Sequence, residues 1–204
     1  MITLDKADGI WTATIDRPDK ANSLTEPMLT ELAGIAEAAQ AARALILTGR
    51  GKVFSAGADL DAARAGLATS PVWERLSGAI AALPCLTIAA LNGTVAGGAM
   101  GMVLACDLRI AVPGARAFYP VMKLGFLPQP SDPARLCTLI GPARAKLILM
   151  AGHKVTTDQA LGWGLFDQVV DDPAALLDTA RALAADSAAA DPEIARGIKA
   201  LCTR

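Results

Sequence analysis

Residues 86–111 read LTIAALNGTVAGGAMGMVLACDLRIA, and this stretch decides the fold. It overlaps residues 76–106, a run without a single charged side chain that is long enough for a transmembrane helix. Asn92-Gly93 and Gly97-Gly98 interrupt the run, and such turn residues open backbone hydrogen bonds that lipid does not satisfy. We therefore predict a buried strand over residues 86–91, a turn, and a buried helix at the second glycine pair, rather than a membrane span.

On either side of this stretch, short apolar strands alternate with helical segments. Asp8-Gly9 separates two apolar runs and indicates a β-hairpin. Residues 119–133 contain four prolines and are predicted as a loop. The alternation predicts an α/β domain with mainly parallel strand pairing. The other predicted strands are 44–48, 53–54, 108–112 and 168–170, and the other predicted helices are 26–39, 60–67, 72–83, 134–150, 157–163, 173–190 and 192–201.

The composition excludes several classes of protein. The chain has 204 residues, enough for one domain with a sizeable core. With 19 Lys and Arg against 20 Asp and Glu, it lacks the basic excess of a nucleic-acid-binding protein. One histidine and four scattered cysteines without CxxC spacing argue against a zinc site. We expect reduced, mostly buried thiols in a cytoplasmic protein, and no metal.

The glycine pair in the central stretch raises the possibility of a nucleotide site. Residues 96–101 read AGGAMG, so Ala96 replaces the first glycine of a dinucleotide fingerprint. Residues 116–121, where the acidic ribose-binding residue is expected, contain no carboxylate. An NAD(P)-dependent Rossmann oxidoreductase is therefore the least favoured interpretation.

The same glycines suit a different chemistry. Gly98 at a helix start leaves a backbone N–H free, and such a donor stabilises an oxyanion when a second N–H converges on the same point. Residues 54–60, FSAGADL, also follow a strand, contain a glycine and precede a helix, so they are the candidate source of the second donor. From spacing alone, both loops are equally compatible with tight packing turns.

Four blocks, taken together, resemble the enoyl-CoA hydratase/isomerase (crotonase) family. They occur in the order and with the spacing typical of that family along nearly the whole chain. The blocks are DRPDKANSL at residues 16–24, FSAGADL at 54–60, NGTVAGG through CDLRIA at 92–111, and TDQALGWGLFDQVV at 157–170.

The resemblance implies a crotonase-like spiral of ββα units that assembles as a homotrimer or a dimer of trimers and binds an acyl-CoA thioester. It places the two thioester-binding N–H groups on Ala58 and Gly98. It also implies no permanently bound cofactor, with coenzyme A arriving as part of the substrate. The residues that it places against coenzyme A are Lys20, Ala21, Ala56, Ala58, Asp59 and Leu60.

The sequence departs from the family where hydratases carry two glutamates. Alignment of the motifs places Gly101 and Val121 at those positions, and neither residue transfers a proton. Asp132 is the only carboxylate in the loop that follows, so it is the acid–base candidate, although its place before a helix favours an N-cap role. Other polar candidates in this region are Tyr119, Lys123, Gln129 and Ser131.

The remaining conspicuous polar residues are expected to be structural. His153 lies in a turn outside the family's catalytic blocks, and we expect it to be exposed and non-catalytic. Asp59 is expected to organise its loop and to cap the following helix. Cys106 and Asp107 come at the end of the buried helix and are also expected to be structural.

These features predict a spiral core over residues 1–170 and a short C-terminal helical segment over 171–204. Measured against the family pattern, we expect several dozen residues of the usual C-terminal helices to be missing. The predicted function is a proton shift, decarboxylation or hydration-type reaction through an enolate of the thioester. The alternative is a CoA-thioester binder without catalytic activity.

Overall fold

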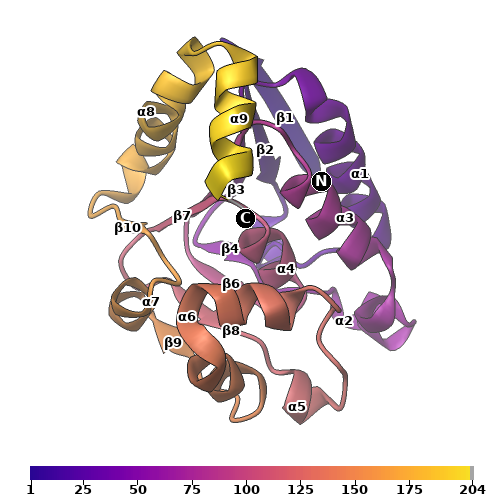
Figure 1. Cartoon of the computed structure of the whole chain (residues 1–204). Helices are drawn as coiled ribbons and strands as arrows, with labels where there is room; N and C mark the ends of the chain where they lie inside the picture. Colours follow the sequence, from indigo (N-terminus) through magenta and orange to yellow (C-terminus); the bar gives the residue numbers. More distant parts are fainter. Residues whose placement is uncertain (203–204) are drawn as a thin grey trace.

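The chain enters its larger sheet through the predicted hairpin. The structure, a computed structural model, describes residues 1–202 (Figure 1). Strands β1 (Ile2–Ala7) and β2 (Ile10–Ile15) pair antiparallel, with Ala7 opposite Ile10. Asp8 and Gly9 between them have φ angles of 52° and 78°. Two successive left-handed residues give the tight turn whose twist matches that of the strands, so the hairpin prediction is confirmed.

Two sheets follow from a repeated ββα order. In three successive pairs of strands, β3–β4, β5–β6 and β7–β8, the first strand joins the larger sheet and the second joins the smaller one. The larger sheet has the order β1-β2-β3-β5-β7-β10 and is parallel beyond β2, whereas the smaller has the order β4-β6-β8-β9. The bounds are β3 (Ala44–Gly49), β4 (Val53–Ser55), β5 (Leu86–Leu91), β6 (Thr94–Ala96), β7 (Leu108–Ala111), β8 (Arg116–Phe118), β9 (Val155–Thr156) and β10 (Gln168–Val169).

Helices cover the sheets on several sides. Helices α1 and α3 pack against each other along one flank, and α8 packs on β3 and β5 (Figure 1). Short 3₁₀ turns at residues 18–20, 39–41, 67–69 and 173–175 join the main elements. The helices are α1 (Glu26–Ala38), α2 (Leu60–Arg64), α3 (Val72–Ala81), α4 (Ala99–Leu104), α5 (Val121–Leu124), α6 (Asp132–Leu149), α7 (Thr157–Trp163), α8 (Leu176–Ala189) and α9 (Pro192–Cys202).

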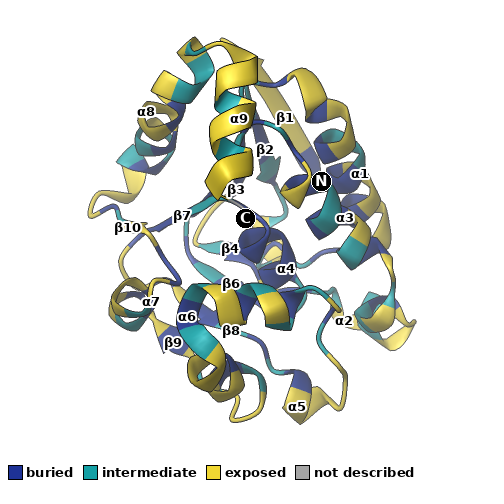
Figure 2. Ribbon diagram, in the orientation of Figure 1, coloured by how far each residue is buried: buried dark blue, intermediate teal, exposed yellow. Residues whose placement is uncertain are grey.

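The uncharged stretch forms the centre of the molecule. Strand β5 is buried over five of its six residues, and every residue of α4 is buried (Figure 2). A charge in either element would lose its hydration without gaining a partner, which explains the composition of this segment. The prediction of a buried strand, a turn and a buried helix is confirmed. None of the helices in residues 1–202 is long and apolar enough to cross a membrane.

Three predicted elements differ from the structure. The helix predicted over 60–67 ends at Arg64, because Gly66 adopts a φ of 105° that is not helical. The loop predicted over 119–133 contains the short helix α5. Helix α6 starts at Asp132, ahead of the predicted 134, and breaks at Gly141, where φ is 79° and ψ is 159°. Pro142 follows that break, and its missing N–H and its ring disfavour a continuous helix there.

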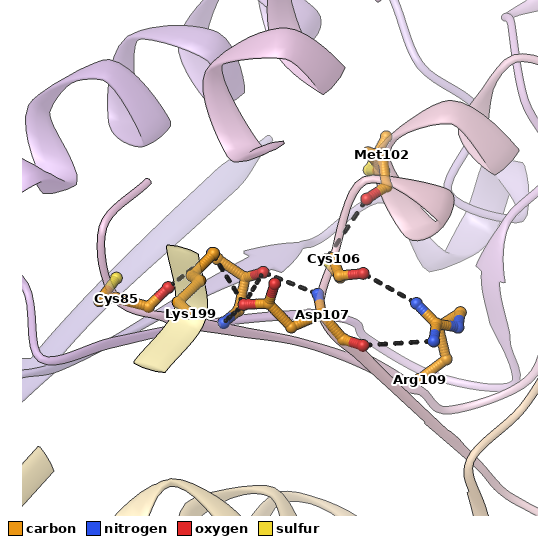
Figure 3. Close-up of polar contacts among 7 residues, drawn as sticks. Cys85, Met102, Cys106, Asp107, Arg109 and Lys199 are labelled. Carbon is orange, nitrogen blue, oxygen red and sulfur yellow. Dashed lines mark hydrogen bonds and ion pairs between the residues drawn. The ribbon is translucent and has the colours of Figure 1, made fainter. Parts of the chain in front are cut away.

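The two C-terminal helices are attached to the core in different ways. Helix α8 buries Leu176, Ala180 and Ala184. Helix α9 is anchored by Lys199, whose Nζ lies 2.8 Å from both Asp107 Oδ2 and the Cys85 carbonyl oxygen (Figure 3). The boundary at residue 170 stays a prediction, and residues 203–204 of the predicted segment lie outside the described residues.

The prediction of mostly buried thiols is only half right. Cys85 and Cys106 are buried, but Cys137 and Cys202 are exposed. Cys137 lies on the outward face of α6, and Cys202 ends α9, of which no residue is buried. All four cysteines are free thiols.

Candidate active site

Two loops meet at the carboxyl ends of neighbouring strands. Strands β4 and β6 pair in parallel, so the loops that leave them start side by side. The two backbones touch at Gly57, where φ is 89° and an added Cβ would lie 2.8 Å from the Ala96 carbonyl oxygen. Glycine is therefore required at this position both for its conformation and for the close approach.

The backbone N–H groups of Ala58 and Gly98 have no acceptor among the residues that the structure describes. The neighbouring amides are used: Gly57 N donates to Ser55 Oγ at 3.2 Å, and Gly97 N donates to the Phe118 carbonyl at 3.0 Å. No hydrogen bond within residues 1–202 uses the N–H of Ala58 or of Gly98. Both residues line the same cavity. The structure thus brings together the two predicted donors.

The cavity is apolar and encloses about 360 Å³. Its wall consists of alanine, leucine, proline, valine and aromatic side chains, and Arg64 is the one charged residue among the described residues that line it. Trp73 closes one side, because its ring lies 3.1 Å from where a Cβ on Gly98 would be. Trp73 Nε1 donates to the Leu67 carbonyl at 2.8 Å, which fixes the ring. Such a wall accommodates an apolar group next to the two N–H donors.

The predicted coenzyme A contacts lie together beside this loop. Ala56 N donates to the Ala21 carbonyl at 3.0 Å, and Leu24 N donates to the Gly57 carbonyl at 2.8 Å. Lys20 is exposed at the end of the 3₁₀ turn over residues 18–20. Leu60 is 75% exposed and also lines the cavity, which places it at the entrance.

Asp59 has the structural role that the sequence predicted. Its side chain accepts from the N–H groups of Asp61 and Ala62 and so caps α2. It also accepts a hydrogen bond from Arg17 Nη1 at 2.8 Å. That bond is the main reason why the pKa of the Asp59 carboxyl is lowered, and the bonds from the two backbone amides lower it further.

Asp132 does not cap α6, so the N-cap prediction is wrong. The capping residue is Ser131, and the Asp132 side chain turns inward and is fully buried. Tyr119 donates its hydroxyl proton to Asp132 Oδ2 at 3.1 Å. Asp132 Oδ1 has no hydrogen-bond partner within residues 1–202, and Arg135 Nη1 is 3.8 Å from it. Burial raises the pKa of Asp132 to about 6.

The two predicted glutamate positions are adjacent to this carboxyl and to the cavity. Gly101 lies in α4, and a Cβ placed on it would be 2.9 Å from Asp132 Oδ1. Val121 is buried and lines the cavity. Tyr119 lines the cavity as well, and burial raises the pKa of its hydroxyl.

Residues 5–204 match the family model described as enoyl-CoA hydratase/isomerase. The chain belongs to the enoyl-CoA hydratase/isomerase family. The 1,2-epoxyphenylacetyl-CoA isomerase of Escherichia coli is 34% identical over 188 residues, which are 86% of this chain and 71% of that protein. The short-chain-enoyl-CoA hydratase of Clostridium acetobutylicum is 33% identical over 196 residues, which are 90% of this chain and 73% of that protein.

Solved structures of enoyl-CoA hydratases have the same fold. The crystal structure of the enzyme from Bacillus anthracis superposes with a TM-score of 0.90 at 31% identity, covering all of this chain and 82% of that one. The predicted crotonase-like spiral and the predicted family are therefore confirmed. The individual site residues, Ala58 and Gly98 included, stay predictions, because no comparison assigns a role to a residue of this chain.

Two residues that join the site gave no sequence signal. Trp73 and Glu74 lie on α3, which was predicted only as a helix. Glu74 approaches the site through Ser131, whose hydroxyl donates to Glu74 Oε1 and whose N–H lies 3.3 Å from Glu74 Oε2. Trp73 reaches the cavity next to Gly98 and Glu74 reaches Ser131, and both contacts join segments far apart in the chain, so only the fold reveals them.

The other polar candidates are used elsewhere or are exposed. Gln129 Nε2 donates to the Ala68 carbonyl at 3.3 Å, and Lys123 is exposed. His153 is half-buried rather than exposed as predicted, because its ring packs 5.9 Å from that of Trp163 and Nε2 hydrogen-bonds Gln159 Oε1 at 3.1 Å. His153 does not line the cavity. Residues 1–202 contain no group of three or more His, Cys, Asp or Glu side chains arranged to hold a metal ion.

Proposed function

We propose that this member of the family acts on an acyl-CoA thioester by stabilising its enolate with the N–H groups of Ala58 and Gly98. The observation that supports the proposal is the pair of unpartnered amides in one apolar cavity. Fixed backbone donors in a water-poor site stabilise developing negative charge on a carbonyl oxygen without having to reorganise. Withdrawal of charge into that oxygen acidifies the carbon next to the thioester, so proton transfer at that carbon becomes accessible.

Within this class, a proton shift or a decarboxylation fits the site better than hydration by two glutamates. Gly101 and Val121 carry no ionisable group, so neither exchanges a proton with water or substrate. The cavity wall contains no carboxylate among the described residues that line it. An apolar acyl group next to the donors fits this wall.

The coenzyme A part of the substrate is proposed to run along the surface beside the donor loop. Lys20 supplies a cation for its phosphates, and Ala21, Ala56, Ala58, Asp59 and Leu60 line the path toward the cavity. Coenzyme A is then part of the substrate rather than a resident cofactor. Assembly as a homotrimer or a dimer of trimers, and a place in the cytoplasm, belong to the same proposal.

Three measurements test the function. Calorimetry measures the binding of CoA, butyryl-CoA and NADH, and NMR in D₂O follows exchange of the butyryl α-protons. Loss of crotonyl-CoA absorbance reports hydration. We expect butyryl-CoA to bind and to exchange, with slow or no hydration. A chain that binds no CoA compound is not a CoA-thioester protein, and binding of NADH instead would favour the dinucleotide interpretation.

The donor pair is tested with matched substitutions at one position. Gly98→Pro and Gly98→Ala both crowd the Trp73 ring, but only proline removes the N–H. We expect the alanine variant to retain much more α-proton exchange than the proline variant, by a factor of about 100. Equal rates in the two folded variants would contradict the assignment of Gly98.

The second candidate function is a thioester binder without catalysis. The absence of a carboxylate from the described lining of the cavity favours it. Tight binding of butyryl-CoA with no exchange and no hydration would establish this alternative over the enzyme.

A further inference from the structure

The Asp132 carboxyl fills the space that a side chain at position 101 would need. A Cβ on Gly101 would lie 2.9 Å from Asp132 Oδ1 and 3.1 Å from Oδ2, closer than ordinary packing allows. Gly101 comes from α4 and Asp132 from the first turn of α6, two helices that pack together. The absence of a side chain at Gly101 therefore leaves room for the Asp132 carboxyl, which enters the interior from α6.

Tyr119 connects this buried carboxyl with the cavity. Its hydroxyl donates to Asp132 Oδ2 at 3.1 Å and lies 3.4 Å from the Gln129 N–H, which donates to it. Tyr119 lines the cavity, whereas Asp132 does not line it and has no exposed surface. Tyr119 is therefore a side chain that both lines the cavity and hydrogen-bonds the buried carboxyl.

The carboxyl is poorly satisfied for a purely structural group. Buried polar atoms in folded proteins are nearly always hydrogen-bonded, because an unmet partner costs free energy. Asp132 Oδ1 and Arg135 Nη1 both lack hydrogen-bond partners within the described chain and lie 3.8 Å apart. A carboxyl with an unused oxygen in a dry site is able to take up a proton.

We propose that Tyr119 and Asp132 form a proton-transfer pair for the thioester reaction, with Tyr119 contacting the substrate and Asp132 acting through it. This rests on the proposed function. In the forward step, a substrate C–H bond breaks and its proton passes to the Tyr119 oxygen while the tyrosine's own proton passes to Asp132 Oδ2. The electron pair of the C–H bond enters the thioester to form the enolate held by Ala58 and Gly98. The reverse transfer returns the proton to carbon.

The first test measures α-proton exchange of butyryl-CoA in Tyr119→Phe and Asp132→Asn variants. Both substitutions keep the shape of the side chain and remove one end of the transfer. We expect each to slow exchange about 100-fold while binding of butyryl-CoA stays within a factor of about three. The double variant should be no slower than the slower single variant, because the two residues act as one unit. Asp171→Asn, at an exposed position, is the matched control and should exchange as the unsubstituted protein does.

A pH profile separates proton transfer from support of the fold. The charged and titratable groups facing Asp132 are Tyr119, Arg135 and Glu74. Because Asp132 takes up the proton in its ionised form, exchange should fall as the pH drops through about 6, the raised pKa of that carboxyl. Asp132→Asn should abolish this fall, whereas the Asp171→Asn control should retain it. A fall that persists unchanged in Asp132→Asn would overturn the proposal.

A rescue experiment uses the shared space directly. Asp132→Ala vacates the volume next to Gly101, and Gly101→Asp in the same chain returns a carboxyl to it from α4. We expect the double variant to exchange at least ten times faster than Asp132→Ala alone, with circular dichroism confirming that both are folded.

The outcomes separate this inference from the proposed function. If Tyr119→Phe and Asp132→Asn exchange as fast as the unsubstituted protein, the pair is not involved, although the function stands. If the unsubstituted protein binds butyryl-CoA without exchanging it, the pair transfers no proton and the inference is wrong. If it binds no CoA compound, the inference fails together with the function.

Discussion

Arg17 and Asp59, 42 residues apart in the chain, form an ion pair with Nη1 and Oδ2 at 2.8 Å. Arg17 lies three residues before Lys20, a predicted coenzyme A contact, and Asp59 follows the Ala58 donor directly. Arg17 Nη1 also approaches the Ser23 carbonyl, at 3.2 Å. The guanidinium therefore links residues 17–23 to the donor loop by hydrogen bonds, and the link should affect the titration of Asp59.

Acid should break the Arg17–Asp59 pair only at a pH below the ordinary aspartate value. The folded pKa of Asp59 is lowered from 3.8, so its contribution to stability is present above that value and is lost as the pH falls through the lower folded pKa. We expect NMR titration of the Asp59 carboxyl to give a midpoint below 3.8 that rises in Arg17→Met. Arg64→Met, which removes an exposed guanidinium, is the control and should leave the midpoint in place.

Helix α9 should loosen when its anchor is removed. Lys199 Nζ contacts Asp107 Oδ2 (Figure 3). The same oxygen also accepts hydrogen bonds from the N–H and the hydroxyl of Thr87, so Lys199 is joined to a hydrogen-bonded network in the core. We expect Lys199→Met to cost about 1–2 kcal/mol in urea unfolding and to speed cleavage near residue 190 by a protease. Lys146→Met on the exposed face of α6 should change neither measurement. Equal protease resistance in both variants would contradict the anchor.

The resemblance to the family places the two donors on Ala58 and Gly98, and this placement does not depend on side-chain identity because the donors are backbone groups. The sequence shows a glycine loop and a helix start at both positions, but strand β6 was not predicted, and its parallel pairing with β4 is what brings the loops together. The convergence of the two loops on one cavity was therefore visible only in the fold.

The orientation of Asp132 was not predictable, because two effects compete at a helix start. Local preference favours a carboxylate that caps the helix, whereas this side chain instead hydrogen-bonds Tyr119 in the interior. Gly101 makes the inward rotamer possible by leaving space on a helix 31 positions earlier in the chain. A local pattern contains no information about that space. A local pattern likewise does not show which thiols are buried, and Cys137 and Cys202 are exposed although mostly buried thiols were predicted.

Two glycines should respond in opposite ways to alanine. A Cβ on Gly93 would lie 2.7 Å from the Lys52 carbonyl carbon and 3.1 Å from Val53 Cα, so β4 would have to move. We expect Gly93→Ala to destabilise the fold by about 2–3 kcal/mol. Gly34 in α1 has no atom within 4 Å of the added carbon, so Gly34→Ala should stabilise by about 0.5–1 kcal/mol through helix propensity. Urea unfolding of both variants measures these changes in stability. An unchanged stability of Gly93→Ala would show that β4 shifts away from position 93 at little cost.

The four thiols should fall into two classes of reactivity. Burial raises the pKa of Cys106 to about 12 and also raises that of Cys85, so both stay protonated at pH 8. The thiolate is the nucleophile, and a buried thiol is also out of reach of the reagent. We expect iodoacetamide at pH 8 to modify Cys137 and Cys202 in the folded protein, and all four cysteines only in denaturant. Mass spectrometry counts the adducts, and rapid labelling of Cys106 in the folded chain would mean that α4 opens readily beside the donor loop.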